Sequence, residues 1–90
     1  MLAPVRSAQF KRDVRRAGKR GRDLTRLRAL LATLLAQEPL AAKHGDLPLR
    51  GIWKGYREAH VAPDWILIYR IEGDELRLIR TGSHADLFRE

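Results

Sequence analysis

The chain has 90 residues, of which 44% are hydrophobic and 32% charged, and this size and composition exclude two separate cores, a solvated disordered tail and a membrane span. The absence of cysteine excludes disulfides and thiolate chemistry, and Pro4 and Arg6 interrupt the start of the chain where a signal peptide would need an unbroken apolar stretch. The net charge of +7 favours a polyanionic partner such as RNA, although it could also serve solubility alone. We predict a single domain over residues 1–90 that works in the cytoplasm.

The first third of the chain predicts a short strand and a basic helix. Residues 2–6 are suited to an edge strand, and Ser7 is a suitable N-cap for the helix that follows. Phe10, Val14 and Ala17 recur at helical spacing. The other face of this helix is basic and carries Lys11, Arg12, Arg15 and Arg16.

A second helix is predicted from about Asp23. Gly18 and Gly21 mark the turn before it, and its leucines recur at intervals of three and four residues. Pro39 is expected to stop this helix, because the residue before a proline is pushed out of the helical region.

The second half of the chain changes to the period of β-structure. Residues 54–61 predict a strand, and a tight turn at 62–64 leads into a second strand over 65–71. Both alternating sets of residues in 65–71 are mostly apolar, which indicates a central strand covered on both faces. A turn at 72–75 and an alternating strand over 76–81 complete a hairpin. The fold class is therefore α+β, with two N-terminal helices packed on a small, mainly antiparallel sheet.

Four polar residues are expected to meet at one edge of this sheet. His60 and Asp64 flank the Pro63 turn, so their side chains can lie within a few ångströms of each other. His84 follows the strand that ends with Arg80 and Thr81, and antiparallel pairing with the strand over 65–71 would bring Arg80 and His84 to the same edge. This convergence is a hypothesis from topology.

Such a group matches the needs of phosphodiester cleavage in RNA. A base takes the proton of the 2′-hydroxyl, an acid protonates the leaving 5′-oxygen, and a cation such as Arg80 or Lys54 offsets charge on the transition state. The alternative is structural, with His60 and Asp64 hydrogen-bonding a turn and His84 capping a helical turn. A metal site on His60, Asp64 and His84 is disfavoured, since the spacing is not compact and the neighbours are basic. We predict no metal and no cofactor.

Aromatic residues next to cations could stack on RNA bases. Trp53 and Tyr56 alternate with Lys54 and Arg57, and Phe88 lies four residues after His84. The alternative for the aromatic rings is burial in the core.

Two motifs give a resemblance to a known family. Residues 53–70 contain His60-x-x-Pro63-Asp64-Trp65, and residues 80–88 contain Arg80, His84 and Phe88. Together they resemble the YafQ-type branch of the RelE/ParE toxin superfamily, and the pattern at 10–13 and the leucine-rich second helix extend the similarity over the whole chain. The resemblance implies a RelE-like fold and a bacterial type II toxin that enters the ribosomal A site, cleaves mRNA there and is neutralised by a cognate antitoxin.

The resemblance also implies roles for individual residues. His60, Asp64 and His84 match catalytic positions, and Arg80 would contact the phosphate. Candidate contacts to mRNA are Lys54, Arg57, Trp65 and Phe88. Cations around the first helix become candidate contacts to ribosomal RNA: Lys11, Arg12, Arg15, Arg16, Lys19, Arg20 and Arg22. We expect the toxin alone to be a monomer and to form a hetero-oligomer with its antitoxin.

One position departs from the family pattern. Many relatives carry a histidine where this chain has Leu47, and His44 lies three residues earlier, beside Gly45. The departure leaves two alternatives to a nuclease open. One is a toxin that has lost activity and only binds its antitoxin, and the other is a gyrase inhibitor of the same superfamily, against which the retained histidines argue.

Overall fold

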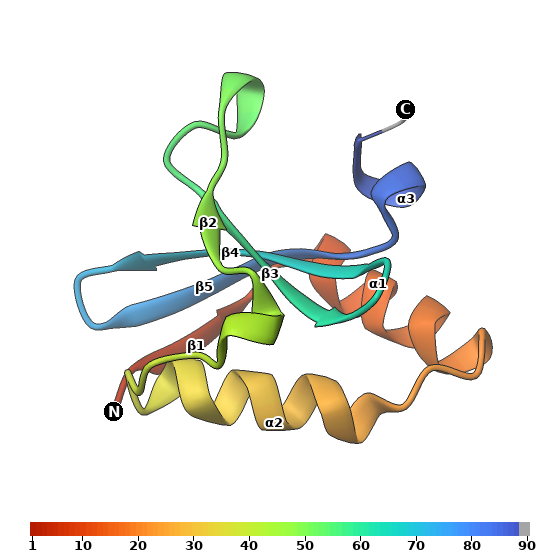
Figure 1. The fold of residues 1–90 in the computed structure, drawn as a ribbon, viewed down its shortest axis with the longest axis horizontal. Coiled ribbons are helices and arrows are strands. Elements are labelled where there is room, and N and C mark those ends of the chain that lie inside the picture. Colours follow the sequence, from red (N-terminus) through yellow and green to blue (C-terminus); the bar gives the residue numbers. More distant parts are fainter. Residues whose placement is uncertain (89–90) are drawn as a thin grey trace.

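The computed structural model describes residues 1–88 and shows helices against a five-stranded sheet (Figure 1). The helices and strands are β1 (Ala3–Arg6), α1 (Ala8–Lys19), α2 (Leu24–Leu35), β2 (Leu47–Pro48), β3 (Arg57–Ala62), β4 (Trp65–Glu72), β5 (Glu75–Gly82) and α3 (His84–Phe88). Two short 3-10 turns, η1 (Ala42–His44) and η2 (Gly51–Trp53), flank β2. Within the described residues, none of the helices has the length and apolar character needed to cross a membrane.

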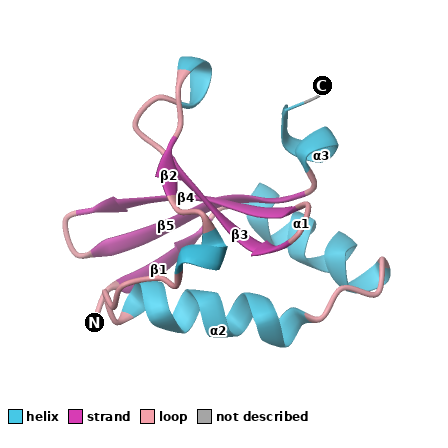
Figure 2. Ribbon diagram, in the orientation of Figure 1, coloured by secondary structure: helices cyan, strands magenta, loops and turns pink. Residues whose placement is uncertain are grey.

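The sheet has the strand order β1-β5-β4-β3-β2 (Figure 2). Only β1 pairs in parallel, with β5, and the other neighbours are antiparallel, so the predicted mainly antiparallel α+β architecture is confirmed. The strand expected over 54–61 begins later, at Arg57, because the chain before it turns at Gly55 with a φ of 95°. β2 was not among the predicted elements, and α3 corresponds to the helical turn at His84 that the structural alternative included.

Both predicted helix starts are confirmed. The Ser7 side chain accepts a hydrogen bond from the Phe10 backbone, and the Asp23 carboxylate accepts one from the Thr25 backbone. The predicted stop at Pro39 is wrong. α2 ends at Leu35, where Gln37 adopts a left-handed φ of 56° and the Glu38 N–H donates to the Thr33 carbonyl, so Pro39 only follows a helix that has already ended.

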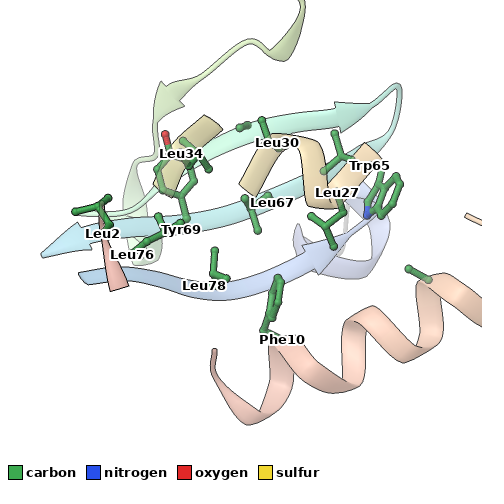
Figure 3. Close-up of a cluster of buried hydrophobic side chains, with 13 residues drawn as sticks. Leu2, Phe10, Leu27, Leu30, Leu34, Trp65, Leu67, Tyr69, Leu76 and Leu78 are labelled. Carbon is green, nitrogen blue, oxygen red and sulfur yellow. The ribbon is translucent and has the colours of Figure 1, made fainter. Parts of the chain in front are cut away.

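The central strand β4 separates two layers of apolar packing. Trp65, Leu67 and Tyr69 face the core under α1 and α2, where they meet the leucines of α2 and Phe10 (Figure 3). Ile66 and Ile68 face the opposite side and pack with Leu87, Trp53, Tyr56, Ile79 and Phe88. Because residues alternate between the two faces of a strand, an almost continuous apolar run is required here, and the predicted two-sided burial is confirmed.

A buried carboxylate joins α1 to the end of β5. The side chain of Asp13 has 0% exposed surface. It accepts hydrogen bonds from Nε and Nη2 of Arg80 at 2.9 and 3.0 Å and from the Thr81 backbone at 3.1 Å. Burial by itself would raise the pKa of Asp13, but the bonds from Arg80, Gln9 and Thr81 hold the pKa below its ordinary value. Asp13 is therefore ionised at neutral pH and fixes α1 on the sheet.

We expect Asp13→Asn to lower the free energy of unfolding by about 3 kcal/mol. An amide cannot accept all these bonds, and the Arg80 charge would lose its partner in a mostly buried place. Urea denaturation followed by tryptophan fluorescence measures the change. Asp74→Asn in the exposed β4–β5 turn is the control and should change stability by less than about 0.5 kcal/mol. An unchanged midpoint for Asp13→Asn would contradict the role of this carboxylate.

Candidate active site

Three of the predicted catalytic residues lie together, beside α3. His60 comes from β3, Asp64 from the β3–β4 turn and His84 from the first residue of α3. The rings of His60 and His84 lie 5.8 Å apart between centroids, and the Phe88 ring lies 6.0 Å from His84. In Figure 1 the β3–β4 turn and α3 lie at the same end of the sheet. The predicted convergence is therefore observed for His60, Asp64 and His84.

Asp64 holds His84 in a defined orientation. Its Oδ1 accepts from the His84 backbone N–H at 3.0 Å and lies 2.9 Å from Nδ1 of the ring. A carboxylate can only accept, so Nδ1 carries a hydrogen and Nε2 is the nitrogen left to exchange a proton. The backbone bond first, and then the ring bond, lower the pKa of Asp64 below its ordinary value.

The β3–β4 turn is itself fixed from the helical side. Asp64 has a φ of 52°, a left-handed conformation that aspartate tolerates better than most residues. Arg22 donates from Nη2 to the Asp64 carbonyl at 3.0 Å, and its guanidinium lies 5.2 Å from the Trp65 ring centroid. Arg22 thus fixes the turn, a structural role beyond the RNA contact expected of it from the sequence.

The hydrogen-bond partner of Asp64 is His84, and no hydrogen bond joins Asp64 to His60 within the described residues. The acidic neighbour of His60 is Glu58, whose Oε2 lies 3.9 Å from Nε2 of the imidazole. Sequence reasoning missed Glu58. Strand alternation could have found it, since residues 58 and 60 must share one face of β3.

Glu58, His60 and His84 could hold a metal ion. One ligand atom from each of these residues lies within 4.8 Å of the others. This set differs from the metal set weighed in the sequence, because Glu58 takes the place of Asp64, whose Oδ1 binds His84. Carboxylate and imidazole ligands of this kind suit zinc or copper.

The start of α3 is fixed by a reciprocal cap. The Ser83 backbone donates to Asp86 at 2.9 Å, and the Asp86 backbone donates to the Ser83 hydroxyl at 3.1 Å. The Asp86 carboxylate also accepts two bonds from Arg20, at 2.7 and 3.3 Å. A Cβ on Gly82 would come within 2.9 Å of Oδ2 of Asp86, so a larger residue there would displace the Asp86 side chain from its cap. This cap determines where α3 places His84.

Three predicted RNA contacts are arginines that already have partners in the protein. Arg80 binds Asp13 through Nε and Nη2. Arg16 lies 3.2 Å from the Asp13 carboxylate and 3.7 Å from that of Asp86. Arg20 binds Asp86. These arginines therefore hold α1, β5 and α3 together, and any contact to RNA would have to use their remaining donors.

Of the residues predicted to contact mRNA, some are held in the protein and others remain exposed. Trp65 is 1% exposed and donates from Nε1 to the Thr81 hydroxyl, so the prediction that it contacts mRNA is wrong, because the ring belongs to the core. Arg57 binds Asp46 at 3.1 Å, yet its side chain stays 43% exposed. Lys54 is exposed. Phe88 is half-buried against Ile66, Ile68 and Leu87 on the other face of the sheet.

The remaining cations of α1 form an outer face. Lys11, Arg12, Arg15 and Lys19 are exposed and make no ion pair with the described residues 1–88. Lys11 and Arg15 also border a groove between α1 and α2 whose floor is apolar. This face is where the predicted contact to ribosomal RNA remains open.

The departure at position 47 lies next to the site. Leu47 pairs with Glu58 across β2 and β3 and is 45% exposed. Directly paired residues of an antiparallel sheet point to the same face, so a side chain at 47 borders Glu58. His44 contacts the backbone of the site instead, with its Nδ1 2.7 Å from the carbonyl of His60.

A family model described as a bacterial toxin of type II toxin-antitoxin system, YafQ, matches residues 2–89. The chain belongs to this family. It is 51% identical over 83 residues to the mRNA interferase toxin YafQ of Escherichia coli strain K12, a match that covers 91% of this chain and 90% of the relative. The predicted family is thereby confirmed.

Solved structures agree with this membership. The E. coli DinJ-YafQ toxin-antitoxin complex contains a chain 48% identical to this one, with a TM-score of 0.88 and coverage of 97% of both chains. A metal-bound toxin from Helicobacter pylori is 40% identical, with a TM-score of 0.92 over 98% of this chain and 100% of that chain. The RelE-like α+β fold expected for the YafQ family is the fold of this chain.

In this YafQ-family toxin, Asp86 should make stability depend on acid pH. The bonds from Arg20 are the largest cause that lowers the pKa of Asp86, far below its ordinary 3.8. A carboxyl with a lowered folded pKa stabilises the protein above its unfolded pKa, and this stability is lost as the pH falls through the folded pKa. We expect the free energy of unfolding to fall from about pH 5 toward pH 2, and to fall less steeply in Asp86→Asn.

Urea denaturation at a series of pH values tests this dependence. Asp74→Asn is the matched control and should keep the slope of the unsubstituted protein. Equal slopes for Asp86→Asn and the unsubstituted protein would show that Asp86 is not linked to folding.

Proposed function

We propose that this toxin is an endoribonuclease that cleaves mRNA in the ribosomal A site and so inhibits translation. The observation that carries the proposal is the Asp64–His84 pair facing His60, which places two imidazoles side by side at an exposed edge. The E. coli relative is named an mRNA interferase, which supports the choice of substrate.

The proposed reaction is an attack by the RNA's own 2′-hydroxyl on the adjacent phosphorus. One histidine removes the hydroxyl proton as the new P–O bond forms, and the other protonates the 5′-oxygen as the old P–O bond breaks. The products are a 2′,3′-cyclic phosphate and a free 5′-hydroxyl. Asp64 holds Nδ1 of His84, which leaves Nε2 to exchange a proton, and stabilises the ring when it is protonated. Two imidazoles at this spacing can serve both ends of the scissile bond.

Arg80 keeps a restricted role in this proposal. Its Nε and one N–H of Nη2 bind Asp13, so it would reach the phosphate through Nη1 or the second N–H of Nη2. The same ion pair fixes the strand from which α3 begins. Arg80 therefore stabilises the site mainly through its ion pair with Asp13, and its remaining N–H donors could offset charge on the transition state.

The proposed partners are the ribosome, mRNA and a cognate antitoxin. The outer face of α1, with Lys11, Arg12, Arg15 and Lys19, would contact the backbone of ribosomal RNA. An E. coli relative is found in complex with the antitoxin DinJ, which supports an antitoxin partner for this chain. A toxin that acts on ribosomes would work in the cytoplasm, as a monomer when free and as a hetero-oligomer with its antitoxin.

We expect the purified protein to cut mRNA in a reconstituted translation reaction and to leave naked mRNA intact. His84→Ala should lower the cleavage rate at least ~100-fold, because it removes a proton-transfer group, and Asp64→Asn should lower it less. Primer extension maps the new 5′ ends. Arg77→Ala, in β5 and paired with Glu75, is the control and should cleave like the unsubstituted protein.

Metal independence is a separate arm of that assay. Protein stripped of transition metals, in a reaction with a chelator that spares magnesium, should keep its rate. Loss of cleavage there would assign the reaction to a metal on Glu58, His60 and His84. Equal cleavage by His84→Ala and the unsubstituted protein would instead overturn the proposal, and intact mRNA throughout would favour a toxin that only binds its antitoxin.

Leu47 offers a gain-of-function test. We expect Leu47→His to raise the cleavage rate, because an imidazole beside Glu58 would add a proton-transfer group next to the scissile phosphate. Leu47→Ala is the control for loss of the leucine alone and should leave the rate unchanged. A rate for Leu47→His no higher than that of Leu47→Ala would show that His60, Asp64 and His84 do not need a further group.

A further inference from the structure

A basic groove lies beside the active site, on the α2 side of β3. It consists of two adjoining hollows of about 330 Å³ each, which share Arg26, Lys43, His44 and Val61. The hollow nearer the active site is also lined by His60. In Figure 1 the short η1 turn that carries Lys43 and His44 lies between α2 and β3. The groove and the active site therefore share one histidine.

The groove has a positive charge that the protein does not neutralise. Arg26 and Lys43 are exposed and form no ion pair with any residue of the described range 1–88. Among residues 1–88, no acidic side chain lines either hollow. Asp23 interacts electrostatically with Arg26. Its carboxylate, however, accepts a hydrogen bond from the Thr25 backbone as the cap of α2. An anion entering the groove would therefore meet two available cations.

His44 and Gly45 hold the η1 side of this groove close to His60. The carbonyl of His60 can only accept, so Nδ1 of His44 carries the hydrogen in their 2.7 Å contact. No hydrogen bond within residues 1–88 uses Nε2 of His44. Gly45 has a φ of 51°, and a Cβ on it would lie 3.3 Å from Nδ1 of His60. Because β2 pairs only with Arg57 and Glu58, the η1 turn occupies the rest of this edge of β3.

We propose that this groove binds the phosphate backbone of the cleaved RNA strand, next to the scissile bond. Arginine and lysine are the side chains that hold phosphate, and Ala62 and Pro63 offer an apolar wall for a ribose or base. Each hollow is near the lower size limit of about 300 Å³ for small-ligand sites, which suits one nucleotide. The shared His60 favours the RNA strand over an acidic peptide. The assignment rests on the proposed nuclease function.

The test removes the two cations together and measures RNA binding without cleavage. A fluorescein-labelled 2′-O-methyl oligoribonucleotide cannot be cut, since it has no free 2′-hydroxyl, and anisotropy reports its binding. Arg26→Gln/Lys43→Gln should weaken binding at least ~10-fold. The slope of log affinity against log salt should become shallower by about 1.4, which corresponds to two lost phosphate contacts on a single strand. We leave His44 intact, because its substitution would also free the His60 carbonyl.

A charge-matched control separates a site from general attraction. Arg28→Gln/Arg77→Gln removes the same charge from exposed positions outside the groove and should change affinity less than 2-fold. Thermal unfolding of both double variants checks that the fold is kept. In the translation assay, the groove variant should need at least ~10-fold more protein for half-maximal cleavage and keep its rate at saturation.

Three results would overturn the proposal. Equal losses in the two double variants would mean attraction by net charge only. An unchanged oligonucleotide affinity with weaker binding to mRNA-free ribosomes would assign the groove to ribosomal RNA. Unchanged binding to both RNAs with weaker antitoxin binding would assign it to an acidic peptide. Because the probe cannot be cleaved, weaker binding by the groove variant would support the groove even if the protein failed to cut mRNA.

Discussion

The buried Asp13 carboxylate is the contact on which the active site most depends. It sits in α1 but accepts from Arg80 and from the Thr81 backbone, at the end of β5. A buried charge must be matched closely, since an unmatched one costs several kcal/mol, so the geometry of these bonds leaves little freedom. Gly82 and Ser83 follow at once, and α3 begins with His84. The position of the His84 imidazole is thus tied to a carboxylate in the opposite layer.

The ionic contacts continue from that carboxylate to the active site. Arg16 lies between Asp13 and Asp86, and Arg20 binds Asp86, which caps α3. At the other end of α3 the Leu87 side chain packs on Ile66 and Ile68, so polar contacts set the start of the helix and apolar packing sets its end. A helix of five residues has little stability of its own, and here both kinds of contact supply it. The His84 orientation therefore comes from tertiary structure.

The sequence predicted what periodicity and local chemistry determine. The alternation of apolar residues in β4 gave its two-sided burial, and Ser7 and Asp23 gave both helix starts. The structural roles of Arg80 and Trp65 were missed because they depend on tertiary contacts. Arg80 forms an ion pair with Asp13, and only the packed structure reveals that the two residues face each other. Trp65 belongs to the core, where it contacts Thr81 and Arg22. The Gln37 turn ended α2 before Pro39 could, and nothing local favours glutamine at a left-handed φ.

The distribution of charge has a consequence for the chemistry. Asp13 and Asp86 form ion pairs with Arg80, Arg16 and Arg20, so these three arginines already have partners in the protein. The site itself then contains two histidines with Glu58 and Asp64, a set suited to moving protons but poor in positive charge. The transition state of phosphodiester cleavage is anionic and needs such charge. A site of this kind favours a substrate strand that is already held in an ordered position, which the ribosome would provide and free mRNA would lack.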